Sequence, residues 1–183
     1  MITAPHRLDE TRPFRAVGVA VLTVSDSRDR SQDRSGDFLE RRVIEAGHEL
    51  VARTLLPDDT KMIEEQLRAW IGAPAVEVVI TIGGTGVTGR DVTPEAIEAV
   101  AEKVIPGFGE LFRWISYPKI GTSTLQSRAL GAVARGTYLF AVPGSTGACR
   151  DAWDEILRWQ LDVRHQPCNL VELLPRLREH ESS

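Results

Sequence analysis

Short apolar runs alternate along the chain with stretches in which apolar residues recur at helical spacing. The runs are rich in Val, Ile, Leu or Thr and cover residues 17–24, 49–56, 76–82 and 137–142. Continuous apolar strands that alternate with helices are typical of a parallel sheet covered by helices on both faces. The pattern therefore predicts a three-layer α/β/α fold with a mostly parallel central sheet.

The stretches between the strands repeat apolar residues at the i, i+3, i+4 and i+7 positions of an amphipathic helix. Helices are expected over residues 37–46, 63–71, 97–104, 108–115 and 153–161. No internal repeat or linker interrupts the pattern. We expect one domain over residues 14–178, a flexible N-terminal extension over residues 1–13 and a flexible C-terminus over residues 179–183.

Composition and charge narrow the range of partners. The 183 residues suffice for one domain with a real core, and 42% hydrophobic and 26% charged residues are typical of globular proteins. A net charge of -4 gives no excess of Lys and Arg for binding nucleic acid. No apolar run is long enough to span a bilayer, and the N-terminal residues lack the apolar core of a signal peptide. These features predict a cytoplasmic protein that binds neither nucleic acid nor membranes.

The cysteines and histidines give little sign of a metal or thiol site. Cys149 and Cys168 stand in no C-x-x-C motif, and the four histidines are scattered along the chain. A zinc site is therefore not expected, and inert thiols are favoured over a cysteine nucleophile.

A glycine-rich stretch over residues 84–89 matches the dinucleotide-binding fingerprint G-x-G-x-x-G and lies close to a P-loop. It follows the third expected strand rather than the first, and a helix with Thr93 as N-cap and Pro94 at its first position starts only beyond Gly89. Arg90 stands where a P-loop needs Lys. Both motifs are therefore disfavoured. The glycines still predict a loop whose backbone N–H groups hold a phosphate or similar oxyanion, with a tight turn that binds no ligand as the alternative.

Polar loops follow all four expected strands. They cover residues 23–26, 56–59, 83–91 and 143–145. Open parallel sheets bind ligands beyond the carboxyl ends of their strands, so these loops are expected to surround one cleft. Carboxylates beside a phosphate-binding loop would repel the ligand unless a cation lies between them, and oxygen ligands with substrate phosphates are the usual setting for Mg²⁺. The arrangement indicates phosphoryl or nucleotidyl transfer rather than hydride transfer.

Two further expectations concern residues outside these loops. The charge-mixed stretch from Arg28 to Arg34 is expected to be a solvated loop, with contact of either arginine to an anion as the alternative. Trp114 and Trp159 are expected in the core or at a subunit contact.

The same residues carry a resemblance to a known family. Its marks are Thr23-Val-Ser-Asp-Ser27, Asp33-Arg-Ser-Gly36, Leu56-Pro-Asp-Asp59, Gly83-Gly-Thr-Gly86, Arg90-Asp-Val-Thr-Pro94, Pro106-Gly-Phe-Gly-Glu110, Ser127-Arg128 and Pro143-Gly-Ser145. By these motifs the chain resembles the MoaB/MogA proteins of molybdenum cofactor biosynthesis, to which the G domain of gephyrin is similar, over about residues 17–174. Stretches such as PGSTGACRDAW are closer to the MoaB branch.

The resemblance implies a molybdopterin adenylyltransferase that uses ATP and Mg²⁺ to place AMP on the terminal phosphate of the pterin and releases pyrophosphate. Asp58 and Asp91 match the two catalytic acids and are candidate Mg²⁺ ligands. Arg128 is expected to pair with a substrate phosphate. The substrate-contacting positions are expected to be Ser25, Asp26, Gly83, Gly84, Thr85, Gly86, Arg90, Ser127, Arg128, Pro143, Gly144 and Ser145.

The resemblance also concerns partners. It implies a homo-oligomer, with a hexamer favoured over a trimer, and contact with the enzyme that inserts the metal. The main alternative is a non-catalytic molybdopterin-binding or scaffold protein of the same fold, since some MoaB-branch proteins lack one or both acids. This chain keeps both, which favours the enzyme. A weaker third interpretation is the related domain of competence-damage proteins, which acts on nucleotides.

Overall fold

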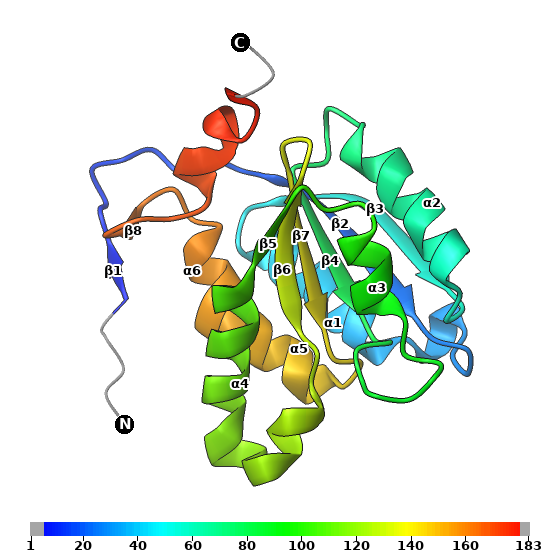
Figure 1. Cartoon of the computed structure of the whole chain (residues 1–183). Helices are drawn as coiled ribbons and strands as arrows, with labels where there is room; N and C mark the ends of the chain where they lie inside the picture. The colour runs from blue at the N-terminus through cyan, green and yellow to red at the C-terminus, as the bar shows by residue number, and fades with distance from the viewer. Residues whose placement is uncertain (1–5, 180–183) are drawn as a thin grey trace.

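A six-stranded sheet lies at the centre of the molecule (Figure 1). The computed structural model describes residues 6–179. The strand order is β3-β2-β4-β7-β6-β5, and β2, β3, β4 and β7 run parallel. The strands are β2 (Gly18–Val24), β3 (Glu49–Leu56), β4 (Val78–Ile82), β5 (Lys103–Ile105), β6 (Leu130–Ala134) and β7 (Thr137–Val142). The mostly parallel sheet that the apolar runs predict is confirmed.

Helices cover both faces of the sheet (Figure 1). The helices are α1 (Arg34–Glu45), α2 (Thr60–Ile71), α3 (Thr93–Glu98), α4 (Pro106–Ile120) and α5 (Thr146–Ala152), which continues through the π-helical η3 (Trp153–Leu157) into α6 (Arg158–Gln160). Short 3-10 helices are η1 (Arg30–Gln32), η2 (Gly121–Gln126) and η4 (Val171–Arg176). Among the described helices, none combines the length and apolar character that crossing a membrane requires.

Strand β2 shows how the sheet joins two cores. Val19 and Val21 pack with α1, α4 and α5, whereas Ala20 and Leu22 pack with α2 and α3 on the opposite face. All seven residues of β2 are buried. This burial on both faces explains why the strand is apolar without alternation.

The antiparallel part of the sheet differs from the sequence prediction. The helix expected over residues 97–104 is wrong beyond its first part, because α3 ends at Glu98 and Val104 lies in β5. Val104 pairs with Ala132 of β6, and its helical spacing from Ile97 has no structural meaning. Strand β6 carries small residues where it packs closely, since a Cβ at Gly131 would lie 3.0 Å from the Phe108 side chain. The residues of β6 are therefore too small to show a strong β pattern.

The expected flexible ends fall partly outside the described residues, namely at residues 1–5 and 180–183. Further along, β1 (Arg7–Leu8) pairs antiparallel with β8 (His165–Gln166). Arg12 forms an ion pair with Glu172 of η4. Residues 7–12 of the expected extension thus contact the C-terminal part of the domain.

Candidate functional site

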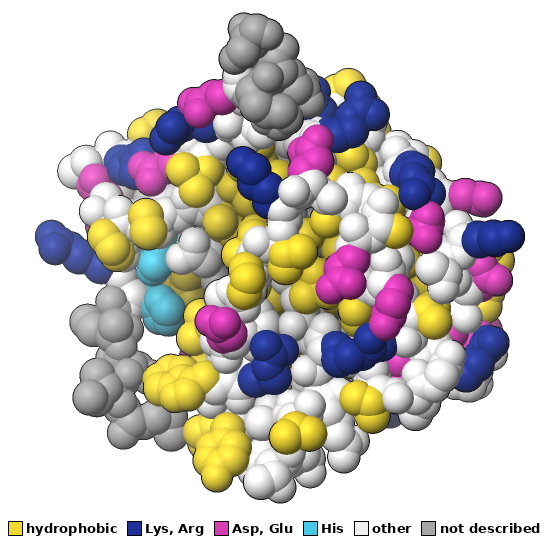
Figure 2. Space-filling view, viewed as in Figure 1, with side chains coloured by type: hydrophobic (Ala, Val, Ile, Leu, Met, Phe, Trp, Pro, Cys, Tyr) yellow, Lys and Arg dark blue, Asp and Glu magenta, His cyan; other side chains and the backbone are white. Residues whose placement is uncertain are grey.

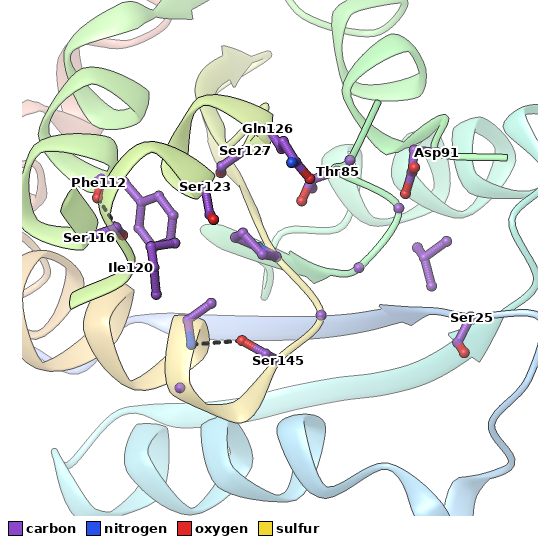
Figure 3. Close-up of a pocket in the computed structure, with 18 of the residues that line it drawn as sticks. Ser25, Thr85, Asp91, Phe112, Ser116, Ile120, Ser123, Gln126, Ser127 and Ser145 are labelled. Atoms are coloured by element: carbon purple, nitrogen blue, oxygen red, sulfur yellow. Dashed lines mark hydrogen bonds between the residues drawn. The ribbon is translucent and has the colours of Figure 1, made fainter. Parts of the chain in front are cut away.

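A cavity of about 920 Å³ opens at the carboxyl ends of the parallel strands (Figure 3). Its wall comes from the loops after β2, β3, β4 and β7 and from α4, η2 and the start of α5. Ser25, Thr85, Asp91 and Ser145, from the loops after β2, β4 and β7, lie around the same space in Figure 3. The volume is at the upper end of the range of small-molecule sites, so the cavity has room for a large ligand.

Most of the residues predicted from the sequence line this cavity. They are Ser25, Asp26, Asp58, Gly83, Gly84, Thr85, Gly86, Arg90, Asp91, Ser127, Pro143, Gly144 and Ser145. Arg128 is the exception and contacts the back of the glycine loop instead. The structure therefore brings together four loops that lie far apart in the sequence.

The glycine loop leaves β4 in a conformation that favours glycine. Gly83 has φ +97° and Gly84 has φ +62°, the left-handed region that other residues rarely adopt. A Cβ at Gly83 would lie only 2.3 Å from the carbonyl oxygen of Val24. The loop can therefore pass close to the end of β2 only because these side chains are absent.

Two carbonyl oxygens of this loop are held by the protein. The N–H of Thr93 donates to Gly84 O at 3.0 Å, and the N–H of Arg128 donates to Thr85 O at 2.9 Å. These bonds fix the course of the loop, and the N–H of Gly83 donates to Val142 O at 3.0 Å. An oxyanion would therefore have to be bound by N–H groups beyond Gly83.

Thr93 differs from its expected role as N-cap. It is the first residue of α3, the N-cap is Val92, and no side chain caps this helix. A Cβ at Gly84 would lie 2.4 Å from Thr93 Oγ1 and 2.9 Å from Asp58 Oδ1, so both oxygens face this glycine. Within residues 6–179, Thr93 Oγ1 is buried and has no hydrogen-bond partner. The hydroxyl therefore faces Gly84 instead of capping its own helix, and Thr93 is not part of the cavity wall.

Asp26 and Asp58 join the loops after β2 and β3. The N–H of Asp26 donates to Asp58 Oδ2 at 3.2 Å, and the N–H of Asp58 donates to Asp26 Oδ1 at 3.0 Å. Burial, with the negative charges of Asp26 and Asp91 nearby, raises the pKa of Asp58 above its ordinary value. Arg90 Nε donates to Asp26 Oδ2 at 2.9 Å, and the hydrogen bonds from Arg90 lower the pKa of Asp26. A cation beside Asp58 would reverse the rise in its pKa.

Asp91 is held within its own loop. Its Oδ2 accepts hydrogen bonds from Thr88 N–H at 2.9 Å and from Thr88 Oγ1 at 2.7 Å. Burial acts to raise the pKa of Asp91, but the hydrogen bonds from Thr88 and the backbone of Gly86 lower it overall. Asp91 is therefore a carboxylate at neutral pH.

The sequence prediction for the Arg128 side chain does not match its placement. Its Nε donates to Gly86 O and its Nη2 to Asp91 O, each at 2.6 Å, and Nη1 pairs with Glu95. The expected phosphate contact would require the guanidinium to face the cavity, which it does not line.

Three basic side chains that the sequence did not assign to the site line the cavity: for Arg28 an anion contact is only the alternative prediction, and Lys119 and Arg150 carry no prediction. Arg28 lines the cavity and donates to Gly144 O at 3.0 Å, in line with the alternative of an anion contact, whereas Arg34 is not part of the wall. Lys119 of α4 and Arg150 of α5 also line it. Neither lies in a polar loop, so only the packing of their helices places them there.

A buried ion pair between Asp33 and Arg53 lies next to the cavity loops. Asp33 Oδ2 accepts from Thr23 Oγ1 and from Arg53 Nη2, each at 2.7 Å, and Oδ1 accepts from Gly36 N–H at 2.9 Å. Burial opposes ionisation, but the hydrogen bonds from Arg53, Thr23 and Gly36 hold the pKa of Asp33 below its ordinary value. Ser35 Oγ donates to Gly144 O at 3.0 Å. The Asp33-Arg-Ser-Gly36 motif thus anchors the β2 and β7 loops.

Comparison with known proteins gives a consistent result. A family model described as "Probable molybdopterin binding domain" matches residues 20–163. Molybdenum cofactor biosynthesis protein B of Escherichia coli K12 is 47% identical over 156 residues, which are 85% of this chain and 92% of that protein. A crystal structure of a molybdenum cofactor biosynthesis protein B has a TM-score of 0.82 at 37% identity, covering 92% of this chain and 99% of that one. A MogA structure has a TM-score of 0.72 at 30% identity, with 87% and 99% covered.

Proposed function

The chain belongs to the MoaB/MogA family of molybdopterin-binding proteins in molybdenum cofactor biosynthesis, and from this premise we propose that it is a molybdopterin adenylyltransferase. It would transfer AMP from ATP to the terminal phosphate of molybdopterin and release pyrophosphate. The observation that carries the proposal is that Asp58 and Asp91 line the same cavity as the glycine loop. Acids and an oxyanion loop in one cavity suit the transfer of a phosphoryl-type group.

The reaction needs no general base from the protein. The second pKa of a phosphate monoester is about 6, so the terminal phosphate of molybdopterin is largely a dianion at neutral pH. One of its oxygens forms a bond to the α-phosphorus of ATP, the bond from that phosphorus to the bridging oxygen breaks, and the electron pair leaves with pyrophosphate. The protein contributes by aligning the two phosphates and by balancing their charge.

The acidic side of the cavity fits Mg²⁺. Within residues 6–179 no three His, Cys, Asp or Glu side chains form a cluster that could hold a metal by itself. Mg²⁺ is usually held by one or two carboxylates together with substrate phosphates and water, and Asp58 and Asp91 of the cavity wall offer two such carboxylates. Bound there, the ion would balance the negative charge that develops on the phosphates.

The basic side chains lie around the remaining wall. Arg28, Lys119 and Arg150 line the cavity together with serine hydroxyls of η2 such as Ser123. We propose that these side chains bind the phosphate oxygens whose charge Mg²⁺ does not balance, because a desolvated phosphate needs several charge-assisted hydrogen bonds.

We also propose that the protein acts as a homo-oligomer, with a hexamer favoured over a trimer. Hydrophobic side chains gather on the exposed surface of α4 (Figure 2), where Leu111, Trp114 and Tyr117 are 41%, 59% and 58% exposed. Leu125 of η2 is 81% exposed. Large exposed apolar patches of this kind mark contact surfaces. Trp114 therefore suits a subunit contact and is not a core residue of the single chain.

A non-catalytic pterin-binding protein is the second candidate, and one observation favours it. Asp26 and Asp58 bind each other's backbone N–H groups, and Asp91 binds Thr88, so each acid also has a structural role. Pyrophosphate release distinguishes the two functions. The enzyme would release pyrophosphate from Mg-ATP only when molybdopterin is present, whereas a binding protein would release none under either condition.

A further inference from the structure

The Arg128 side chain connects both ends of the loop that carries Asp91. Its Nε donates to Gly86 O at one end and its Nη2 to Asp91 O at the other, each at 2.6 Å. Its Nη1 pairs with Glu95, and its backbone N–H donates to Thr85 O at 2.9 Å. Arg128 therefore holds the loop over residues 86–91 through both its main chain and its side chain.

The other bonds of this loop are internal or reach the β2 loop, since Arg90 Nε donates to Asp26 Oδ2 at 2.9 Å from an exposed position. The N–H of Asp91 donates to Thr88 O at 3.1 Å, and the Asp91 carboxylate accepts from Thr88. The bonds between Thr88 and Asp91, with the contact from the Gly86 backbone, fix Asp91 within the loop. The Arg90–Asp26 pair is solvent-exposed and is expected to restrain the loop only weakly. Val87 is 65% exposed and Gly89 has no atom within 4 Å of its Cβ position, so packing restrains the loop tip weakly.

The geometry of the guanidinium suits bridging rather than substrate binding. Arg128 does not line the cavity, and all three of its side-chain nitrogens have protein acceptors. A planar guanidinium can donate to two carbonyl oxygens at fixed positions, whereas the single ammonium group of Lys cannot reproduce that fork. The contacts with Gly86 and Asp91 thus require arginine itself.

We propose that Arg128 is a positioning residue that fixes the 86–91 loop and thereby places the Asp91 carboxylate for the reaction. The kinetic part of this inference rests on the proposed adenylyl transfer. The structural part, that Arg128 restrains the loop, does not depend on any activity. The two parts are tested separately.

The kinetic test compares Arg128→Ala and Arg128→Lys with Glu95→Gln as the matched control. Glu95→Gln removes only a half-exposed ion pair and leaves the bonds to both carbonyl oxygens, so its turnover should match the wild type. Misplacement of a reacting group by about 1 Å costs about 100-fold, so Arg128→Ala should lower kcat by roughly 10- to 100-fold. The KM values for ATP and molybdopterin should change by less than about threefold, because no substrate contact is lost.

Rescue gives a readout that general damage to the fold would not produce. Methylguanidinium added to Arg128→Ala should restore part of kcat, and Arg128→Lys should remain impaired. A rise in KM for either substrate with unchanged kcat would overturn the inference and make Arg128 a substrate-binding residue.

The structural test uses hydrogen exchange without substrate. In Arg128→Ala and Arg128→Lys, the hydrogen-bonded amides of Thr88 and Asp91 should exchange at least about 10-fold faster, while those of β4 and β7 keep their wild-type rates. Unchanged exchange in the loop would overturn the positioning role. Because this test needs no turnover, it is informative even if the wild type does not adenylylate the pterin.

Discussion

Replacement of Gly83 by Ala tests whether the glycine loop depends on the missing side chain. With φ at +97°, an Ala at this position would adopt a backbone conformation that costs about 1–2 kcal/mol. Its Cβ would also lie 2.3 Å from Val24 O, a backbone atom of the buried strand β2 that cannot move away cheaply. Overpacking of this kind costs about 1–3 kcal/mol. Gly83→Ala should therefore lower the free energy of unfolding by about 2–5 kcal/mol.

The matched control lies in the same loop. At Gly89 a Cβ would meet no atom within 4 Å, and φ is not in the left-handed region, so Gly89→Ala should change the free energy of unfolding by less than about 1 kcal/mol. Urea unfolding followed by tryptophan fluorescence at one protomer concentration measures both variants. If Gly83→Ala were as stable as Gly89→Ala, the argument that only glycine fits beside Val24 would be refuted.

Three further predictions concern the surroundings of the cavity. Asp33→Asn should lower the free energy of unfolding at pH 7 by about 1–3 kcal/mol, because Arg53 loses its buried partner and keeps only the more exposed Asp37 and Glu40. The pKa of Asp33 in the folded protein is lowered from 3.8, so the ionised carboxylate stabilises the fold above pH 3.8, and this stabilisation is lost in stronger acid. Urea unfolding at pH 3 should therefore show a smaller difference in the free energy of unfolding between Asp33→Asn and the wild type than at pH 7. Trp114→Glu should shift sedimentation toward smaller species if the α4 surface is a subunit contact, and an unchanged profile would contradict this. Lys119→Gln should weaken ATP or molybdopterin binding by about three- to tenfold in calorimetry, since it removes a cavity cation, and unchanged affinities for both would argue against that role.

The parallel half of the fold could be predicted because its signals are local. β2 is buried on both faces and is therefore an uninterrupted apolar run, which the sequence shows directly. β5 and β6 lie at the antiparallel end of the sheet. Val104 of β5 is 49% exposed, and β6 has glycine at position 131, where a side chain would lie too close to Phe108. Exposure at an edge and close packing both weaken the apolar pattern, so a helix was predicted at Val104 instead.

The placement of the site residues could be predicted to the level of loops but not of side chains. The carboxyl ends of parallel strands meet at one edge, which places Asp58 and Asp91 at the same cavity as predicted. Sequence position does not show which way a side chain turns, however. Arg128 turns to the back of the glycine loop, and Thr93 turns toward Gly84 rather than capping α3. Lys119 reaches the cavity only through the packing of α4.

Adenylyl transfer to molybdopterin can be detected from the products of the reaction. Purified protein would be mixed with Mg-ATP and fresh molybdopterin, in parallel with Asp91→Asn, and the products analysed by mass spectrometry. We expect adenylylated pterin from the wild type alone, with near-normal pterin binding by the variant. Adenylylated pterin from Asp91→Asn at the wild-type rate would contradict the role of Asp91. Absence of product from a wild type that binds pterin tightly would contradict the enzyme and favour a binding protein.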